Sequence, residues 1–182
     1  MGSEDGTRTR LGEVAKLPDG TESAKDQDRG AAVVEFAIVV PLLLTLVFGI
    51  IEFGWTFGQH LDVRHGAREA SRLVAVDYLP RSVDPSTVSA ADHAAYIVDA
   101  TCDRMDLADD SEVTLSLDGG GGTVGEFVEV TVKSELQTIT GWFDAILGSK
   151  ELESTVSTRV EQEATWAEVT GMTCAAAAAA IP

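Results

Sequence analysis

The longest apolar run in the chain extends from Ala31 to Ile51 and interrupts an otherwise polar sequence. Its 21 residues contain one formal charge, Glu35. At about 1.5 Å of rise per residue, a helix of this length spans the roughly 30 Å of hydrocarbon in a bilayer. A run that is apolar on all sides is typical of a membrane span and not of a core helix. The pattern therefore predicts a transmembrane helix over residues 31–52.

The sequences on the two sides of this run differ in pattern. Residues 1–30 are polar and lack apolar periodicity, so they are predicted to be a disordered leader. After the span a helical pattern continues to about Val76, which predicts a helix extension over residues 53–76. Three arginines in this extension recur at intervals of four and share one helix face: Arg64, Arg68 and Arg72. This face is expected either to meet anionic headgroups or an acidic partner, or to remain solvated.

Residues 77–174 have the mixed patterning of a small α+β head. Asp84 and Pro85 predict the cap and first turn of a helix. One side of that helix is marked by apolar and small residues at steps of three and four: Ala94, Ile97, Val98, Thr101, Cys102 and Met105. Thus Cys102 is expected on the buried side.

The strands are predicted by alternation of apolar and polar residues. Residues 113–117 and 128–132 both alternate and are joined by the glycine-rich segment 118–126, which predicts a hairpin. A third strand is predicted over residues 154–162, and residues 175–182 form an alanine-rich tail that either extends a helix or stays mobile. A short amphipathic helix is predicted by Ile139, Trp142, Phe143, Ile146 and Leu147.

The predicted fold class is thus α+β. A long N-terminal transmembrane helix continues into a small head of about three antiparallel strands and two short helices.

Charge narrows the set of possible functions. The formal net charge is -17, of which -2 precedes and -15 follows Gly30. Such a surface repels phosphate backbones, so no nucleic-acid binding is expected, whereas it keeps a secreted or surface domain soluble. No zinc-like Cys/His spacing, phosphate loop or catalytic constellation is evident. We therefore expect no metal, no cofactor and no enzymatic activity.

The orientation of the span is not decided by counting basic residues, because the two flanks carry equal numbers. Large domains translocate largely regardless of charge, and Arg29 abuts the membrane entry. The two cysteines, Cys102 and Cys174, both lie downstream, where an oxidising compartment could join them. We therefore predict a cytoplasmic-membrane protein with a cytoplasmic N-terminus and an extracytoplasmic head. The cysteines form either a disulfide or two free thiols.

Several unusual features occur in order near the span: Gly30, Glu35 followed by Phe36, Pro41, and "FGIIEFG" at its exit. With these features the segment from Arg29 to about Val76 resembles TadE-like proteins. These are minor pilins or pseudopilins of bacterial tight-adherence (Flp-type) pili, within the type IV pilin class. The resemblance is looser beyond Val76, although "STVSTRVEQ" is similar to the final strand of the family.

The resemblance implies processing and assembly. It implies that a prepilin peptidase cuts between Gly30 and Ala31, and that Glu35 pairs with the new α-amine of a neighbouring subunit. Opposite charges attract strongly in low dielectric, and either charge alone is costly there. The implied partners are this peptidase, other pilins or pseudopilins, the pilus assembly platform and membrane lipid. The spacing of Gly54 and Gly58 independently indicates close helix packing.

The predicted function is therefore a minor pilin or pseudopilin that takes part in assembling an adhesive pilus. Two alternatives remain open. One is a signal-anchored, single-pass membrane protein that is never cut and whose extracytoplasmic head binds a ligand. The other is an extracytoplasmic hydrolase, which would need a nucleophile and a base brought together from distant residues.

Overall fold

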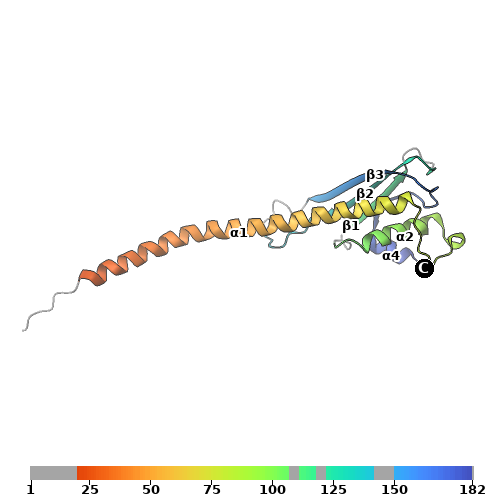
Figure 1. Cartoon of the computed structure of the whole chain (residues 1–182). Coiled ribbons are helices and arrows are strands. Elements are labelled where there is room, and N and C mark those ends of the chain that lie inside the picture. The colour runs from red at the N-terminus through yellow and green to blue at the C-terminus, as the bar shows by residue number, and fades with distance from the viewer. Residues whose placement is uncertain (1–19, 107–110, 118–121, 142–149, 182) are drawn as a thin grey trace, which may run out of the picture. The chain divides into compact units, whose positions relative to one another are not determined.

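A computed structural model describes residues 20–106, 111–117, 122–141 and 150–181 of the 182-residue chain, and side chains from Gly30 onward. The chain forms two compact units, Met1–Leu46 and Val47–Pro182. The described elements are α1 (Gly20–Ala75), a 3-10 helix η1 (Pro85–Thr87), α2 (Ala90–Cys102) and α4 (Cys174–Ala180), with four strands. The strands are β1 (Ser111–Leu117), β2 (Phe127–Glu135), β3 (Glu151–Arg159) and β4 (Val169–Thr173) (Figure 1).

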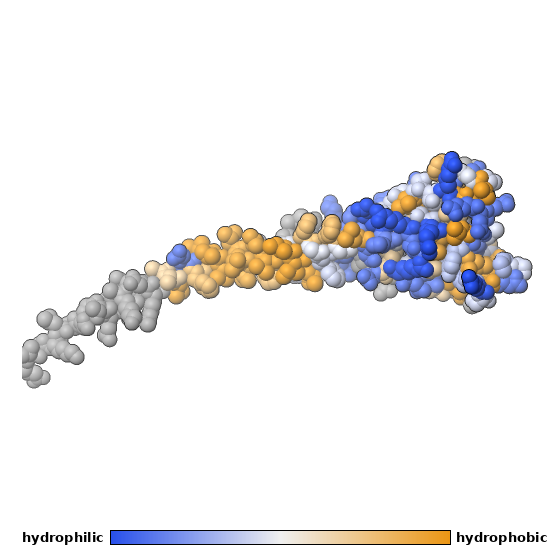
Figure 2. Space-filling model, in the orientation of Figure 1, coloured by the Kyte–Doolittle hydropathy of each residue, from blue (hydrophilic) through white to orange (hydrophobic). Residues whose placement is uncertain are grey.

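Helix α1 contains the predicted span and its extension in one element, and it ends at Ala75, close to the predicted boundary at Val76. From Gly30 to Ala75 it is the one helix among the described residues that is long and apolar enough to cross a membrane. Pro41 lies inside this helix. Figure 2 shows an extended hydrophobic surface along the stretch of α1 that precedes the head.

The start of α1 differs from the sequence-based expectation. The helix begins at Gly20, although residues 1–30 were predicted to be disordered; residues 1–19 lie outside the described part of the chain. Once a long helix is nucleated, adding further residues to its end costs little. The segment before Gly30 also contains good helix formers such as Glu22, Ala24 and Lys25. Polarity alone therefore does not predict disorder where a segment adjoins a stable helix.

The sheet is antiparallel, in the order β3-β2-β1-β4. Strands β1 and β2 form the predicted hairpin, in which Val113 lies opposite Val132 and Leu115 opposite Val130. Strand β3 pairs with β2 along its whole length, with Val156 opposite Val130. The predicted fold class is confirmed, but the sheet has four strands and not about three.

The helices cover one face of the sheet, and the other face is exposed or partly exposed. Strand β2 alternates between exposed or half-buried residues and buried ones, as expected for an antiparallel sheet with one wet face. A single core cluster joins α1, α2, α4 and the inner face of the sheet. Its fully buried members include Val63, Ala67, Ala70, Val98, Val113, Leu115, Val128, Val130 and Val132.

The second helix begins later than predicted. Asp84 and Pro85 start only η1, where the Asp84 carboxylate accepts a hydrogen bond from Ser86 N at 2.9 Å. This hydrogen bond holds the pKa of Asp84 below its usual value. Helix α2 starts at Ala90, after Ser89, whose hydroxyl accepts from Asp92 N at 3.1 Å. Asp84 and Ser89 are both common N-cap residues, so the sequence alone did not show which of them starts α2.

Two further elements complete the comparison with the predicted head. The apolar stripe of α2 is buried as expected, from Ala94 to Cys102, and so is Met105 just beyond it. The alanine-rich tail is the helix α4. Of the short amphipathic helix predicted around residues 139–147, Ile139 lies in an irregular segment and residues 142–147 lie outside the described residues.

Candidate functional site

The residues that the sequence places at the processing and pairing site lie in α1. Gly30, Ala31 and Glu35 are exposed, and the Phe36 side chain is 68% exposed. Glu35 has no hydrogen bond or ion pair with any residue whose side chain the structure describes. The carboxylate is therefore available to a group on another molecule.

The surface that follows Glu35 is apolar on all sides of the helix. Within Val47–Ile51, for example, Ile50 is 65% exposed, and in the preceding stretch Leu42 is 73% exposed. Exposed apolar surface of this extent is unfavourable in water and favourable in hydrocarbon. One N-terminal apolar helix of this kind suggests single-pass anchoring in a membrane.

None of the described residues packs closely against Gly54 or Gly58. A Cβ atom added at either position would meet nothing within 4 Å. Both glycines border an open hollow of about 320 Å³, whose other lining residues are Trp55, Gln59, Asp62, Asp106 and Gln137. The predicted close packing of this glycine pair therefore has no partner among the residues that the structure describes.

Glu52 joins α1 to the rest of the head through three hydrogen bonds, and sequence reasoning missed it. Its side chain is only 2% exposed, although it is charged. Oε1 accepts from Ile139 N at 3.0 Å, while Oε2 accepts from Thr140 N at 3.1 Å and from Thr140 Oγ1 at 2.7 Å. Three donors thus satisfy a carboxylate that would otherwise be costly to bury.

Two neighbours of Glu52 on α1 extend this contact to the same loop. Gln59 Nε2 donates to Gln137 O at 2.6 Å, and Gln137 N donates to Gln59 Oε1 at 2.8 Å. Trp55 Nε1 also donates to Gln137 O, at 3.0 Å. The only signal in the sequence was the spacing of Glu52, Trp55 and Gln59, which puts three polar groups on one face next to an apolar span. We call Glu52, Trp55, Gln59 and residues 137–141 the loop clamp.

Arg64, Arg68 and Arg72, which form the arginine face of α1, are exposed. This agrees with the expectation of a solvated face. Arg72 pairs with Glu69 at 3.2 Å, and Glu69 also pairs with Arg104. Arg64 lies 13 residues beyond Ile51, which corresponds to about 20 Å along a helix. Since the Debye length at physiological salt is about 8 Å, attraction to headgroups is weak at that distance. The geometry favours a solvated face or an acidic protein partner over lipid.

His93 has a structural environment. His93 is buried, and its Nε2 lies 2.8 Å from Tyr78 O while its Nδ1 lies 2.7 Å from Thr165 Oγ1. Thr165 N in turn donates to Asp77 Oδ1 at 2.9 Å. This network ties the end of α1 to α2 and to the segment before β4. Among the described residues no group of three or more His, Cys, Asp or Glu side chains could hold a metal ion.

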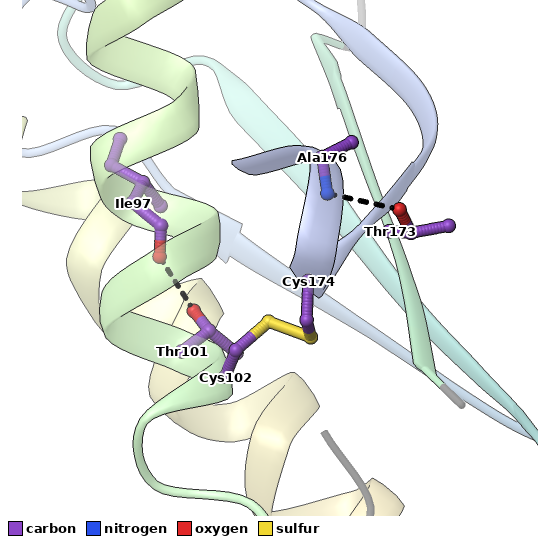
Figure 3. The surroundings of a disulfide bond; sticks show 6 residues. All are labelled: Ile97, Thr101, Cys102, Thr173, Cys174 and Ala176. Carbon is purple, nitrogen blue, oxygen red and sulfur yellow. Dashed lines mark hydrogen bonds between the residues drawn. A yellow bond between two sulfur atoms is a disulfide. The ribbon is translucent and has the colours of Figure 1, made fainter. Parts of the chain in front are cut away.

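Cys102 and Cys174 are joined by a disulfide in the structure, with Cα atoms 5.8 Å apart (Figure 3). Cys102 is the last residue of α2 and Cys174 the first of α4. Helix α4 is capped by Thr173, whose hydroxyl accepts from Ala176 N at 3.2 Å. Because α4 has only seven residues, it would be marginal alone. The bond holds this short helix against α2.

Replacing both cysteines by serine is expected to destabilise the head by about 4 kcal/mol, because the bond closes a loop of 72 residues in the unfolded chain. The measurement is urea unfolding of the full chain in detergent, followed by the fluorescence of its tryptophans. Reductant should lower the unfolding midpoint of the unaltered chain and leave the Cys102→Ser/Cys174→Ser variant unchanged. Equal midpoints for the oxidised and reduced chain would contradict this role.

These features define a protein with an exposed apolar helix, a single carboxylate within the apolar run of that helix, and a small disulfide-linked α+β head. Residues 30–72 match the family model described as TadE-like protein, so the resemblance seen in the sequence is confirmed over this segment. The match suggests a pilin-like protein associated with tight-adherence pili. The comparison with curated proteins found no match, and the comparison with solved structures also found none.

Proposed function

We propose that this chain is a prepilin-like subunit that a prepilin peptidase cuts between Gly30 and Ala31 and that takes part in assembling a tight-adherence pilus. The observation that carries the proposal is the combination of an exposed apolar helix with an exposed Glu35, inside the TadE-like segment, that has no partner among the side chains the structure describes. In a membrane such a carboxylate needs a positive partner. The α-amine created by the cut supplies one. The role is therefore association and not catalysis.

The local backbone is compatible with cleavage at this position. Glycine in a helix interior costs about 1 kcal/mol relative to alanine, so α1 is comparatively easy to unwind at Gly30. Gly30 is exposed, and a Cβ atom there would meet nothing within 4 Å. Any requirement for glycine at this position would thus come from the peptidase and not from folding of the chain.

The disulfide supports the orientation that we propose, with the head outside the cytoplasm. Disulfides persist in oxidising compartments and are rare in the cytosol. The cytoplasmic side would then hold the residues before Gly30, and the apolar helix would anchor the chain in the cytoplasmic membrane. The proposed partners are the peptidase, other pilin-like subunits and the assembly platform.

The test is the N-terminal residue of the protein purified from its own cells, determined by mass spectrometry. We expect Ala31 at the mature N-terminus. A chain that keeps the residues before Gly30 while pili form normally would overturn the proposal. That result would favour the alternative function, an uncut membrane-anchored protein whose head binds a ligand.

The glycine pair offers a separate test of subunit association. Replacing both Gly54 and Gly58 by leucine is expected to leave the stability of the head unchanged, because both positions are open. Association between copies or with other pilin-like subunits should fall about tenfold or more, since bulky side chains keep helices apart. The measurement is co-purification of differently tagged subunits from membranes, together with a thermal melt of each variant.

Gly66 provides the matched control for this test. A Cβ atom at Gly66 would collide with the Met105 side chain, which is 7% exposed. Gly66→Leu should therefore destabilise the head by about 1–3 kcal/mol through overpacking. If the Gly54/Gly58 variant melts as early as the Gly66 variant, the pair has a folding role and the association argument fails.

A further inference from the structure

Large apolar side chains remain exposed in the first turns of α1 beyond Ile51. Phe53 is 72% exposed and Phe57 is 53% exposed, and the two rings stack with centroids 6.4 Å apart. Trp55 lies between them in sequence, on another side of the helix, and is 43% exposed. Tryptophan residues such as Trp55 are enriched at the ends of membrane spans, where their rings lie at the level of the lipid headgroups. This part of the helix therefore marks the boundary between hydrocarbon and water.

The hydrogen bonds of the loop clamp hold residues 137–141 beside α1, at the level of these aromatic residues. Glu52 accepts hydrogen bonds from the backbone N–H groups of Ile139 and Thr140, so the height of this loop on the helix is set by Glu52. The Ile139 side chain takes no part in these bonds and is 54% exposed. The backbone hydrogen bonds thus hold the apolar Ile139 side chain near the aromatic residues of α1, and they leave this side chain exposed.

Charge distinguishes this loop from the rest of the head. Residues 136–141 carry no formal charge, although the chain beyond Gly30 is strongly acidic. Glu52, the acid that binds this loop, is 2% exposed and has its carboxylate occupied by three donors. The loop can therefore approach lipid without placing a bare charge at the hydrocarbon edge.

We propose that the loop of residues 137–141 rests on the membrane surface, with the Ile139 side chain inserted among the lipids at the level of Phe53 and Phe57. The occupant of this apolar surface is the bilayer itself, because the surface is continuous with the exposed apolar residues of the span, such as Ile50 and Ile51. The loop clamp is then a spacer that fixes how close the head lies to the membrane. This inference holds whether or not the chain is cut at Gly30.

The test uses the full chain, with its disulfide formed, in phosphatidylcholine vesicles that contain a nitroxide-labelled acyl chain. An environment-sensitive fluorophore is attached to a cysteine introduced by Ile139→Cys or, as a matched control, by Val124→Cys. Val124 is 65% exposed and precedes β2, whereas Ile139 follows β2. The nine residues of β2 separate the two positions by about 30 Å. Leu43→Cys, in the apolar run, reports insertion of the span.

We expect nitroxide quenching at position 139 to exceed that at position 124 by about threefold or more. Iodide in the water should quench in the reverse order. Adding Glu52→Gln replaces one carboxylate oxygen, the acceptor of the hydrogen bonds from Thr140, by an amide nitrogen. Because the loop is then held less firmly, lipid quenching at position 139 should fall while quenching at position 43 stays the same. If position 43 is quenched by lipid but position 139 is as accessible to iodide as position 124, the inference is overturned. If position 43 also fails to be quenched, membrane anchoring itself is contradicted.

Discussion

Replacing Glu35 by alanine is expected to leave cleavage at Gly30 intact and to abolish incorporation of the subunit into its assembly. In the proposed contact, Glu35 of one subunit meets the α-amine at Ala31 of its neighbour. Removing one member of a buried ion pair leaves the other charge unpaired, which costs about 3–5 kcal/mol. At 1.4 kcal/mol per factor of ten, this loss weakens each contact about a hundredfold to a thousandfold or more.

The measurement has two readouts, immunoblots for the size of the chain and co-purification with other pilin-like subunits for assembly. Glu35→Asp is the matched control, because it keeps the charge on a shorter side chain and should retain part of the association. Phe36→Leu, at an exposed apolar position next to it, should change association far less than Glu35→Ala. Normal co-purification of the Glu35→Ala variant would rule out the proposed pairing.

A bulky residue at Gly30, such as leucine, is expected to leave uncut precursor in the membrane. The physical reason lies in the protease: a side chain before the scissile bond would crowd its cleft. The chain itself has room for this side chain, since nothing lies within 4 Å of a Cβ atom at Gly30. Leucine also favours the helix by about 1 kcal/mol over glycine, so it resists the local unwinding that cleavage needs.

The measurement is again the size of the chain on immunoblots from the native cells, where precursor and mature forms differ by the residues up to Gly30. Gly54→Leu is the matched control, because Gly54 is likewise an exposed helical glycine with open space around it. This control should be cut as efficiently as the unaltered chain. Full processing of the Gly30→Leu variant would show that the cut does not depend on glycine at this position.

The elements predicted correctly are those whose signal is local and repeated. The apolar run of 31–51 and the spacing after it are enough to predict α1 through Ala75, because helix periodicity and span length can be read along the chain. Alternation likewise predicted β1 and β2, and the third strand was predicted over residues 154–162, three residues later than β3 lies. The buried stripe of α2 was found from residues three and four apart. The segment matched to TadE-like proteins is also a local pattern.

Other features required the tertiary structure. Strand β4 has an irregular burial pattern and pairs with β1 across a register shift, so its sequence lacks clean alternation. The buried state of Glu52 was not predictable, because its donors at Ile139 and Thr140 come from 87 and 88 residues away. Sequence also left the partner of Cys102 open, whereas packing of α4 on α2 brings Cys174 to it.

The sequence by itself thus determined which run is long and apolar enough to cross a membrane, which acid lies inside that run, and that an α+β head follows. These properties depend on residues close together in sequence, and the pattern that they form along one helix or strand can be read directly. Only the tertiary structure decided that a second acid, Glu52, holds a loop against the end of the span, and that Gly54 and Gly58 face open space. Contacts between residues far apart in sequence depend on how whole elements pack, and no local pattern encodes that packing.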